Sequence, residues 1–295
     1  MKTKIFFALL FVVSVLTGCS DNDSLLPSEE ELFPTKTNTE LDKQLNELFR
    51  PYNTIVEYRY IKNLIPDDWY YIYPVEEELV VPMAEFLKAY WIGPLEAGSS
   101  REFVVKNFPR MILLIGSSAY NMDGTRVTGQ AEGGTLIRFT EVNDYNIEKE
   151  KWISGQLETA FHEYAHILHQ TFGFPDDYRD ITPDSYTKGG WKSLKLKDAI
   201  KLGMVSNYAC SAPEEDFAEL FYFWIVSPYA DLEYVFNEQP TGGLKPSQVQ
   251  DVVEMNAGRR IIQKKLLTME KYLQRIGVDL QNIRNDLQHR LGHEE

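Results

Sequence analysis

The 295-residue sequence predicts an α+β fold. Strand-like runs of β-branched and apolar residues lie before about residue 142, whereas helical spacing of apolar residues dominates from residue 150 onward. Hydrophobic side chains make up 43% of the chain and charged side chains 25%, proportions typical of a globular protein that buries a full core. The formal net charge of −14 argues against nucleic acid as a partner, because such binding needs a basic surface.

Residues 1–18 have the features of a secretory signal peptide. Two lysines precede an uncharged apolar run, Ile5 to Leu16, which is too short to span a bilayer as a permanent helix. The segment ends in Leu16-Thr17-Gly18-Cys19, which resembles the bacterial lipobox, where cleavage precedes a lipidated cysteine. The resemblance implies an outer membrane lipoprotein, anchored through Cys19 and displayed at the cell surface or facing the periplasm. An ordinary cleaved signal with an incidental cysteine is the alternative.

Residues 19–39 are expected to form a flexible tether, and residues 40–295 a single folded domain. The tether is polar, acidic and contains proline, with no apolar period. If Cys19 carries lipid, Cys210 has no partner for an intrachain disulfide, even in an oxidising compartment. Nothing in the sequence specifies an oligomer, and a monomer is favoured.

Alternating and helical patterns predict the first elements of the domain. Apolar residues recur at helical spacing over residues 41–49, and Pro51 ends that helix. The aromatic cluster at residues 69–73 is interpreted as half-buried core and loop, with a sugar-stacking patch as the alternative. The run Val104–Ile115 predicts a buried strand. Two further strands are expected over Thr125–Val127 and Thr135–Val142, next to glycine turn signals.

Helices are expected to build most of the remaining chain. Residues 150–172 predict one long helix, and residues 173–193 form a loop rich in proline and glycine. The last two helices are expected at about 247–275 and 278–291, because apolar residues form a single stripe in the first of them.

The long helix carries a metal-binding motif within a cluster of three of the chain's five histidines. One face of the helix is apolar, and His162-Glu163-Tyr164-Ala165-His166 has the pattern H-E-x-x-H. His166 lies one turn along from His162 and about 40° around the helix, so two imidazoles can reach one ion. Glu163, about 100° from His162, can reach a metal-bound water. The spacing predicts a site for one zinc ion.

A third protein ligand distinguishes the classes of zinc enzyme. His169 lies too far along the helix to reach the same ion and is interpreted as a flanking or supporting residue. The metzincin pattern fails here, because it needs glycine at the position of His169 and histidine at that of Phe172. The remaining source is a carboxylate from a later helix.

The segment 211–224 provides that later helix. Ser211 and Glu214 are expected to form a capping box, while Glu215 and Glu219 share one side of the helix. The helix is apolar beyond these residues, and buried acids are costly unless they are paired or bind metal. A solvated helix start with the usual excess of acids accounts for Glu214 and Asp216, but accounts poorly for Glu219.

These segments resemble a family of zinc-binding metallopeptidases among Bacteroidetes lipoproteins. The second half also resembles the catalytic domain of anthrax lethal factor, where a tyrosine precedes the glutamate ligand by the interval that separates Tyr208 from Glu215. The landmarks in this chain are His162-Glu163-Tyr164-Ala165-His166 with Gln170, Val205-Ser206-Asn207-Tyr208-Ala209, and Glu215-Asp216-Phe217-Ala218-Glu219.

The resemblance implies a zincin-like fold, with a mixed sheet followed by the zinc-site helix and a mostly helical C-terminal half. It implies a gluzincin site in which Glu215 is the third zinc ligand and Glu219 is the hydrogen-bond partner of a zinc histidine. It also implies that the phenol of Tyr208 faces the oxyanion. Because Glu214 lies next to Glu215, the sequence does not decide which of the two glutamates is the third ligand.

The sequence therefore predicts a zinc-dependent metallopeptidase that hydrolyses peptides or proteins, with Glu163 as the general base. Thr135–Val142 is the expected edge strand that pairs with an extended substrate. One alternative is a non-catalytic, zinc-containing surface binding protein that serves nutrient or glycan uptake. A serine or cysteine hydrolase is disfavoured, because Gly116-Ser117-Ser118 lacks the second glycine of a nucleophile elbow and Cys210 has no placed histidine partner.

Overall fold

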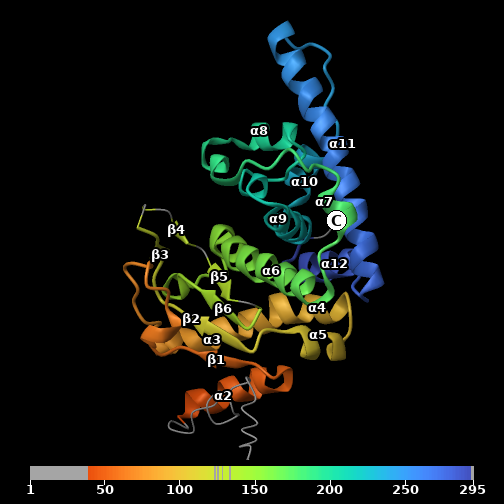
Figure 1. Ribbon diagram of the computed structural model, residues 1–295. Helices are drawn as coiled ribbons and strands as arrows, with labels where there is room; N and C mark the ends of the chain where they lie inside the picture. Colours follow the sequence, from red (N-terminus) through yellow and green to blue (C-terminus); the bar gives the residue numbers. More distant parts are fainter. Residues whose placement is uncertain (1–38, 123, 125, 128, 133, 294–295) are drawn as a thin grey trace, which may run out of the picture. The chain divides into compact units, whose positions relative to one another are not determined.

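The computed structural model describes residues 39–293, apart from residues 123, 125, 128 and 133 (Figure 1). The predicted signal peptide, the lipidation position Cys19 and the tether up to residue 38 lie outside the described residues. Among the helices of the described part, none combines the length and the hydropathy that a bilayer crossing requires.

Helices precede and follow the first strand. The predicted first helix is α2 (Glu40–Phe49), which begins with a capping box: the Thr39 hydroxyl accepts from the Asp42 amide, and the Asp42 carboxylate accepts from the Thr39 amide. The further helical elements before the second strand are η1 (Arg50–Tyr52), η2 (Lys62–Leu64), α3 (Glu77–Leu87), the π-helical turn η3 (Lys88–Ile92), α4 (Gly93–Ala97) and α5 (Arg101–Asn107).

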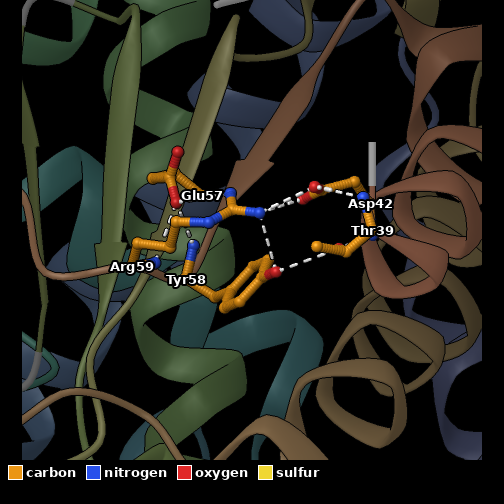
Figure 2. A network of polar contacts seen from close by, with 5 residues as sticks. All are labelled: Thr39, Asp42, Glu57, Tyr58 and Arg59. Atoms are coloured by element: carbon orange, nitrogen blue, oxygen red, sulfur yellow. Dashed lines mark hydrogen bonds and ion pairs between the residues drawn. The ribbon is translucent and has the colours of Figure 1, made fainter. Parts of the chain in front are cut away.

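A polar network joins α2 to the end of the first strand, β1 (Ile55–Glu57) (Figure 2). The Arg59 guanidinium contacts both carboxylate oxygens of Asp42, at 2.6 and 2.7 Å, and donates to the Tyr58 hydroxyl. Burial raises the pKa of Asp42, but hydrogen bonds from Arg59 and Thr39 outweigh it and leave the pKa below its usual value. The carboxylate is therefore charged at neutral pH, which keeps α2 attached beside β1.

The prediction of a strand over Val104–Ile115 is wrong for the first half of that segment. Residues 101–107 form α5, whose N-cap Ser100 accepts a hydrogen bond from the Phe103 amide. The helix ends at Phe108, which is extended because Pro109 follows it. The strand itself, β2, covers only Met111–Leu114.

A four-stranded mixed sheet has the order β1-β2-β6-β5. The first three strands are parallel, and β5 (Gly129–Glu132) runs antiparallel to β6 (Leu136–Phe139), with Gly129 opposite Phe139. A separate antiparallel pair comprises β3 (Ala119–Tyr120) and β4 (Arg126–Val127).

The prediction that Thr135–Val142 forms the edge strand is wrong. The strand there, β6, pairs with β2 on one side and with β5 on the other, and all four of its residues are buried. Burial on both faces is a property of interior strands, and the apolar sequence Leu-Ile-Arg-Phe fits that position. The edge next to β6 is β5, whose sequence Gly-Gln-Ala-Glu is more polar.

The C-terminal half is helical, as predicted. Its helical elements are η4 (Val142–Asp144), α6 (Glu150–Phe172), α7 (Asp176–Arg179), η5 (Lys188–Ser193), α8 (Leu196–Lys201), η6 (Tyr208–Cys210), α9 (Pro213–Val226), α10 (Tyr229–Phe236), α11 (Pro246–Arg275) and α12 (Leu280–Arg290). The predicted spans 150–172, 247–275 and 278–291 match α6, α11 and α12 closely. Figure 1 shows α6 between the sheet and α9, and α6 contacts β5, β6 and α9.

Apolar side chains cover both faces of the sheet. Ile112, Leu114 and Phe139 belong to the main core with the apolar face of α6, whereas Leu113 and Leu136 pack with Ile65 and Trp69 on the opposite face. Within the predicted aromatic cluster, Trp69 is buried and the tyrosines at positions 70, 71 and 73 are exposed. The main core therefore fixes α6 against the sheet, with the opposite side of the helix turned to α9.

Candidate metal centre

Helix α6 positions its two histidines through the burial of its other faces. Leu157, Phe161, Tyr164 and Leu168 are fully or almost fully buried in the main core. Phe161 meets Phe221 of α9, with ring centroids 6.4 Å apart. This packing orients the remaining face, with His162 and His166, toward the first turns of α9.

The start of α9 differs from the predicted capping box. The N-cap is Ala212, which has no side chain that could accept a hydrogen bond, and Pro213 occupies the first turn. The hydroxyl of Ser211 is buried without a hydrogen-bond partner among the described residues. Because the helix begins after Ser211, Glu214 faces Arg179, 3.5 Å from its guanidinium, and Glu215 faces the histidines.

Within the described part of the chain, one group of acid and histidine side chains is spaced to hold a metal ion: His162, His166 and Glu215. The two Nε2 atoms lie 3.1 Å apart, and Glu215 Oε2 lies 3.1 Å from His162 Nε2 and 3.4 Å from His166 Nε2. A tetrahedral zinc ion with bonds of about 2.0–2.1 Å has ligand atoms about 3.3–3.4 Å apart. The donor types and their separations therefore fit zinc.

Glu219 lies on the side of His162 that faces away from Glu215. Its Oε1 lies 2.9 Å from His162 Nδ1, and its Oε2 accepts a hydrogen bond from the Ser206 hydroxyl at 2.5 Å. The same hydroxyl accepts from the Ala209 amide at 3.0 Å, so Ser206 links the carboxylate to η6. With Nδ1 of His162 engaged by a carboxylate, Nε2 is the nitrogen left for a metal.

Negative charge dominates the electrostatics of the site. Burial lowers the pKa of His162, but contacts with Glu215 and Glu219 outweigh it and raise the pKa to about 10. Burial raises the pKa of Glu215, but the contacts with His162 and His166 have the larger effect. They hold this pKa well below its usual range. The charge of Glu163 also acts on His162. Carboxylates that favour a protonated imidazole favour a bound cation for the same reason.

Tyr208 lies on η6 against the same histidine. Its ring stacks on that of His162 with centroids 5.9 Å apart, and it meets the ring of Trp191 edge to face with centroids 4.9 Å apart. Burial, Glu215, Glu219 and Glu163 all raise the pKa of the phenol. Tyr208 therefore keeps its proton at neutral pH and can act as a hydrogen-bond donor at the site.

The structure also brings in residues to which sequence reasoning gave no role. Ser206 belongs to a landmark segment, but nothing in its spacing showed that it supports Glu219. Asp216, which sequence reasoning attributed to a solvated helix start, is instead 1% exposed and forms an ion pair with Lys265 of α11. That pair joins residues 49 positions apart, so no local pattern could reveal it.

Comparisons with known proteins agree with this geometry. A family described as "putative zinc-binding metallo-peptidase" matches residues 34–281. A crystal structure of a zinc-binding metallo-peptidase from Bacteroides caccae, also described as putative, is 30% identical, with a TM-score of 0.68 over 85% of this chain and 91% of the other. Among curated proteins, no significant relative is found. The family match covers most of the chain, and the chain therefore belongs to this family of putative zinc-binding metallopeptidases.

Proposed function

We propose that this protein is a gluzincin-type zinc metallopeptidase that hydrolyses peptide bonds. The observation that carries the proposal is the convergence of His162, His166 and Glu215 from two helices on a single point. Two neutral imidazoles and one carboxylate are a donor set of catalytic zinc sites, which leave one position for water. A structural zinc site more often has four protein ligands, and within the described residues this group has three.

Each remaining polar residue of the site has a distinct role in this proposal. Bound zinc supplies Lewis-acid chemistry and lowers the pKa of water to about 7. Glu163 accepts the proton of the attacking water and later delivers it to the leaving amine. Tyr208, protonated and in contact with His162 and Trp191, donates a hydrogen bond to the oxygen that gains charge.

The strand next to the site gives a place for an extended substrate. Among the described residues, strand β5 (Gly129–Glu132) is paired with β6 on one side only, so its other backbone edge can accept a peptide strand. It contacts α6, the helix that bears the histidines. We infer that a peptide or protein substrate pairs with β5, in place of the strand expected from the sequence.

Membrane anchoring is part of the same proposal. The lipobox-like segment ending at Cys19 supports a lipoprotein held at the outer membrane, at the cell surface or facing the periplasm. Metabolic labelling with a fatty-acid analogue tests this: the label is expected on the wild-type protein and absent from Cys19→Ala. A labelled Cys19→Ala protein would refute the anchor position.

Substitution of the general base tests the enzymatic activity. Glu163→Gln is expected to bind zinc as the wild type does and to lose cleavage of a peptide library, followed by mass spectrometry. Glu150→Gln, at an exposed position of the same helix, is the matched control and keeps wild-type cleavage. Wild-type cleavage by Glu163→Gln would overturn the assignment, and a zinc-loaded wild type that cleaves nothing would favour the non-catalytic binding protein.

A further inference from the structure

The third histidine of α6 contacts the second. His169 Nε2 lies 2.8 Å from His166 Nδ1, and the two rings meet edge to face with centroids 5.0 Å apart. His166 Nε2 lies on the opposite side of its ring, next to His162 and Glu215. His169 is therefore behind the donor group, where it cannot be a fourth ligand of the same ion.

Two phenylalanines hold the His169 ring in place. Phe174, which follows α6, and Phe217 of α9 meet it edge to face, with centroids 5.4 and 6.2 Å away. The histidine is 8% exposed, so its orientation toward His166 is set by packing from two separate segments. A clamped ring is a better hydrogen-bond partner than a mobile one, because it loses less conformational entropy.

The chemistry of His166 determines what His169 must do. An imidazole that binds metal through Nε2 carries its proton on Nδ1, and that N–H needs an acceptor. In the structure, the group at hydrogen-bonding distance from His166 Nδ1 is His169 Nε2. A neutral His169 with its own proton on Nδ1 supplies the acceptor.

We propose that His169 is a positioning residue that accepts a hydrogen bond from Nδ1–H of His166 and so fixes the metal-binding tautomer of that ligand. The proposal rests on the proposed metal centre. The two histidine ligands then have different hydrogen-bond partners at Nδ1. The partner of His162 is the Glu219 carboxylate, and the partner of His166 is a neutral imidazole ring. A carboxylate at position 169 would add a fourth negative charge to Glu163, Glu215 and Glu219.

The affinity for zinc tests the positioning role of His169. It is measured on the full chain by competition with a chromogenic chelator. His169→Phe keeps an aromatic ring but lacks the acceptor, and we expect about 10- to 100-fold weaker zinc binding. His169→Gln retains an acceptor oxygen, and its affinity is expected to stay nearer to that of the wild type. His289→Phe, an exposed histidine of α12, is the matched control and binds zinc unchanged. Equal losses in His169→Phe and His169→Gln, or no loss in either, overturn the role.

A spectroscopic readout separates this role from simple packing. In the zinc-loaded wild type labelled with ¹⁵N-histidine, long-range ¹H–¹⁵N spectra are expected to show His166 protonated at Nδ1 and His169 unprotonated at Nε2. A proton on His169 Nε2 overturns the proposal, even if the variants fail to fold. Zinc binding without peptide cleavage would refute the peptidase function and leave this inference standing.

Discussion

Lys265 Nζ lies 2.7 Å from Asp216 Oδ2, and both side chains are only 1% exposed. Asp216 directly follows Glu215 on α9, and the Tyr186 hydroxyl donates to the same carboxylate oxygen at 2.9 Å. Burial raises the pKa of Asp216 and lowers that of Lys265, while their mutual attraction opposes both shifts. The pair joins α11 to the first turns of α9, which carry the candidate ligand Glu215.

Removal of the charged amino group of Lys265 is expected to destabilise the fold. Lys265→Met leaves the Asp216 carboxylate buried without its partner, which costs about 3–5 kcal/mol in comparable cases. The free energy of unfolding, measured by urea denaturation of the metal-free protein, gives this cost. Lys264→Met, on the exposed side of the same helix, is the control and changes little. The double variant Asp216→Asn, Lys265→Met is expected to recover more than half of the loss, because no buried charge remains. A single variant as stable as the wild type would contradict the argument.

Glu219 is expected to control zinc affinity without being a ligand. Glu219→Gln replaces the carboxylate that engages His162 Nδ1 by a neutral amide, and zinc binding should weaken about 10- to 100-fold. Ser206→Ala removes the donor to Glu219 and the acceptor of the Ala209 amide but keeps the carboxylate, and it should have a smaller effect in the same direction. Chelator competition measures both affinities, with Glu214→Gln as a neighbouring control on α9. Unchanged affinity in Glu219→Gln would refute the supporting role.

The parts of the site that lie within one helix could be predicted from the sequence. His162, Glu163 and His166 share α6, and helical spacing alone sets their relative positions. Glu215 and Glu219 share a side of α9 for the same reason, but their approach to α6 depends on packing between residues such as Phe161 and Phe221. That approach was expected from the need for a third ligand, from the cost of burying acids in an apolar helix and from the resemblance to known zinc sites.

The errors lie where the outcome depends on non-local pairing or on competing local signals. The edge position of β5 is set by which strands pair with β6, and strand order is not contained in the pattern of either strand. In α5, the β-branched Val104 and Val105 favoured a strand, but the Ser100 cap and Pro109 define a short helix that precedes β2. The packing that holds His169 against His166 was also inaccessible, because it includes Phe217 from α9.

Zinc binding is expected to release about one proton near pH 8. In the metal-free site the pKa of His162 is about 10, because Glu215 and Glu219 outweigh the effect of burial, so the imidazole is protonated at that pH. A metal needs the neutral form, whereas Glu215 is already ionised and releases no proton. Affinity should therefore fall as the pH falls below 10. Calorimetry in buffers of different ionisation enthalpy measures the proton count, and Glu219→Gln should reduce it. A count of zero for the wild type at pH 8 would contradict the expectation.

Tyr208 is expected to contribute to turnover and not to metal binding. Tyr208→Phe keeps the ring that stacks on His162 but removes the hydroxyl, so zinc affinity should stay unchanged. Loss of one donor to a developing oxyanion typically lowers kcat by about 100- to 1000-fold. Peptide hydrolysis by the zinc-loaded variant measures the loss, with the exposed Tyr234→Phe as the control.

If kcat stays at the wild-type level, Tyr208 serves only to pack His162, and the oxyanion must be stabilised by zinc and other donors. If kcat falls while KM stays constant, the phenol acts in the transition state, because a residue that binds only the ground state changes KM instead.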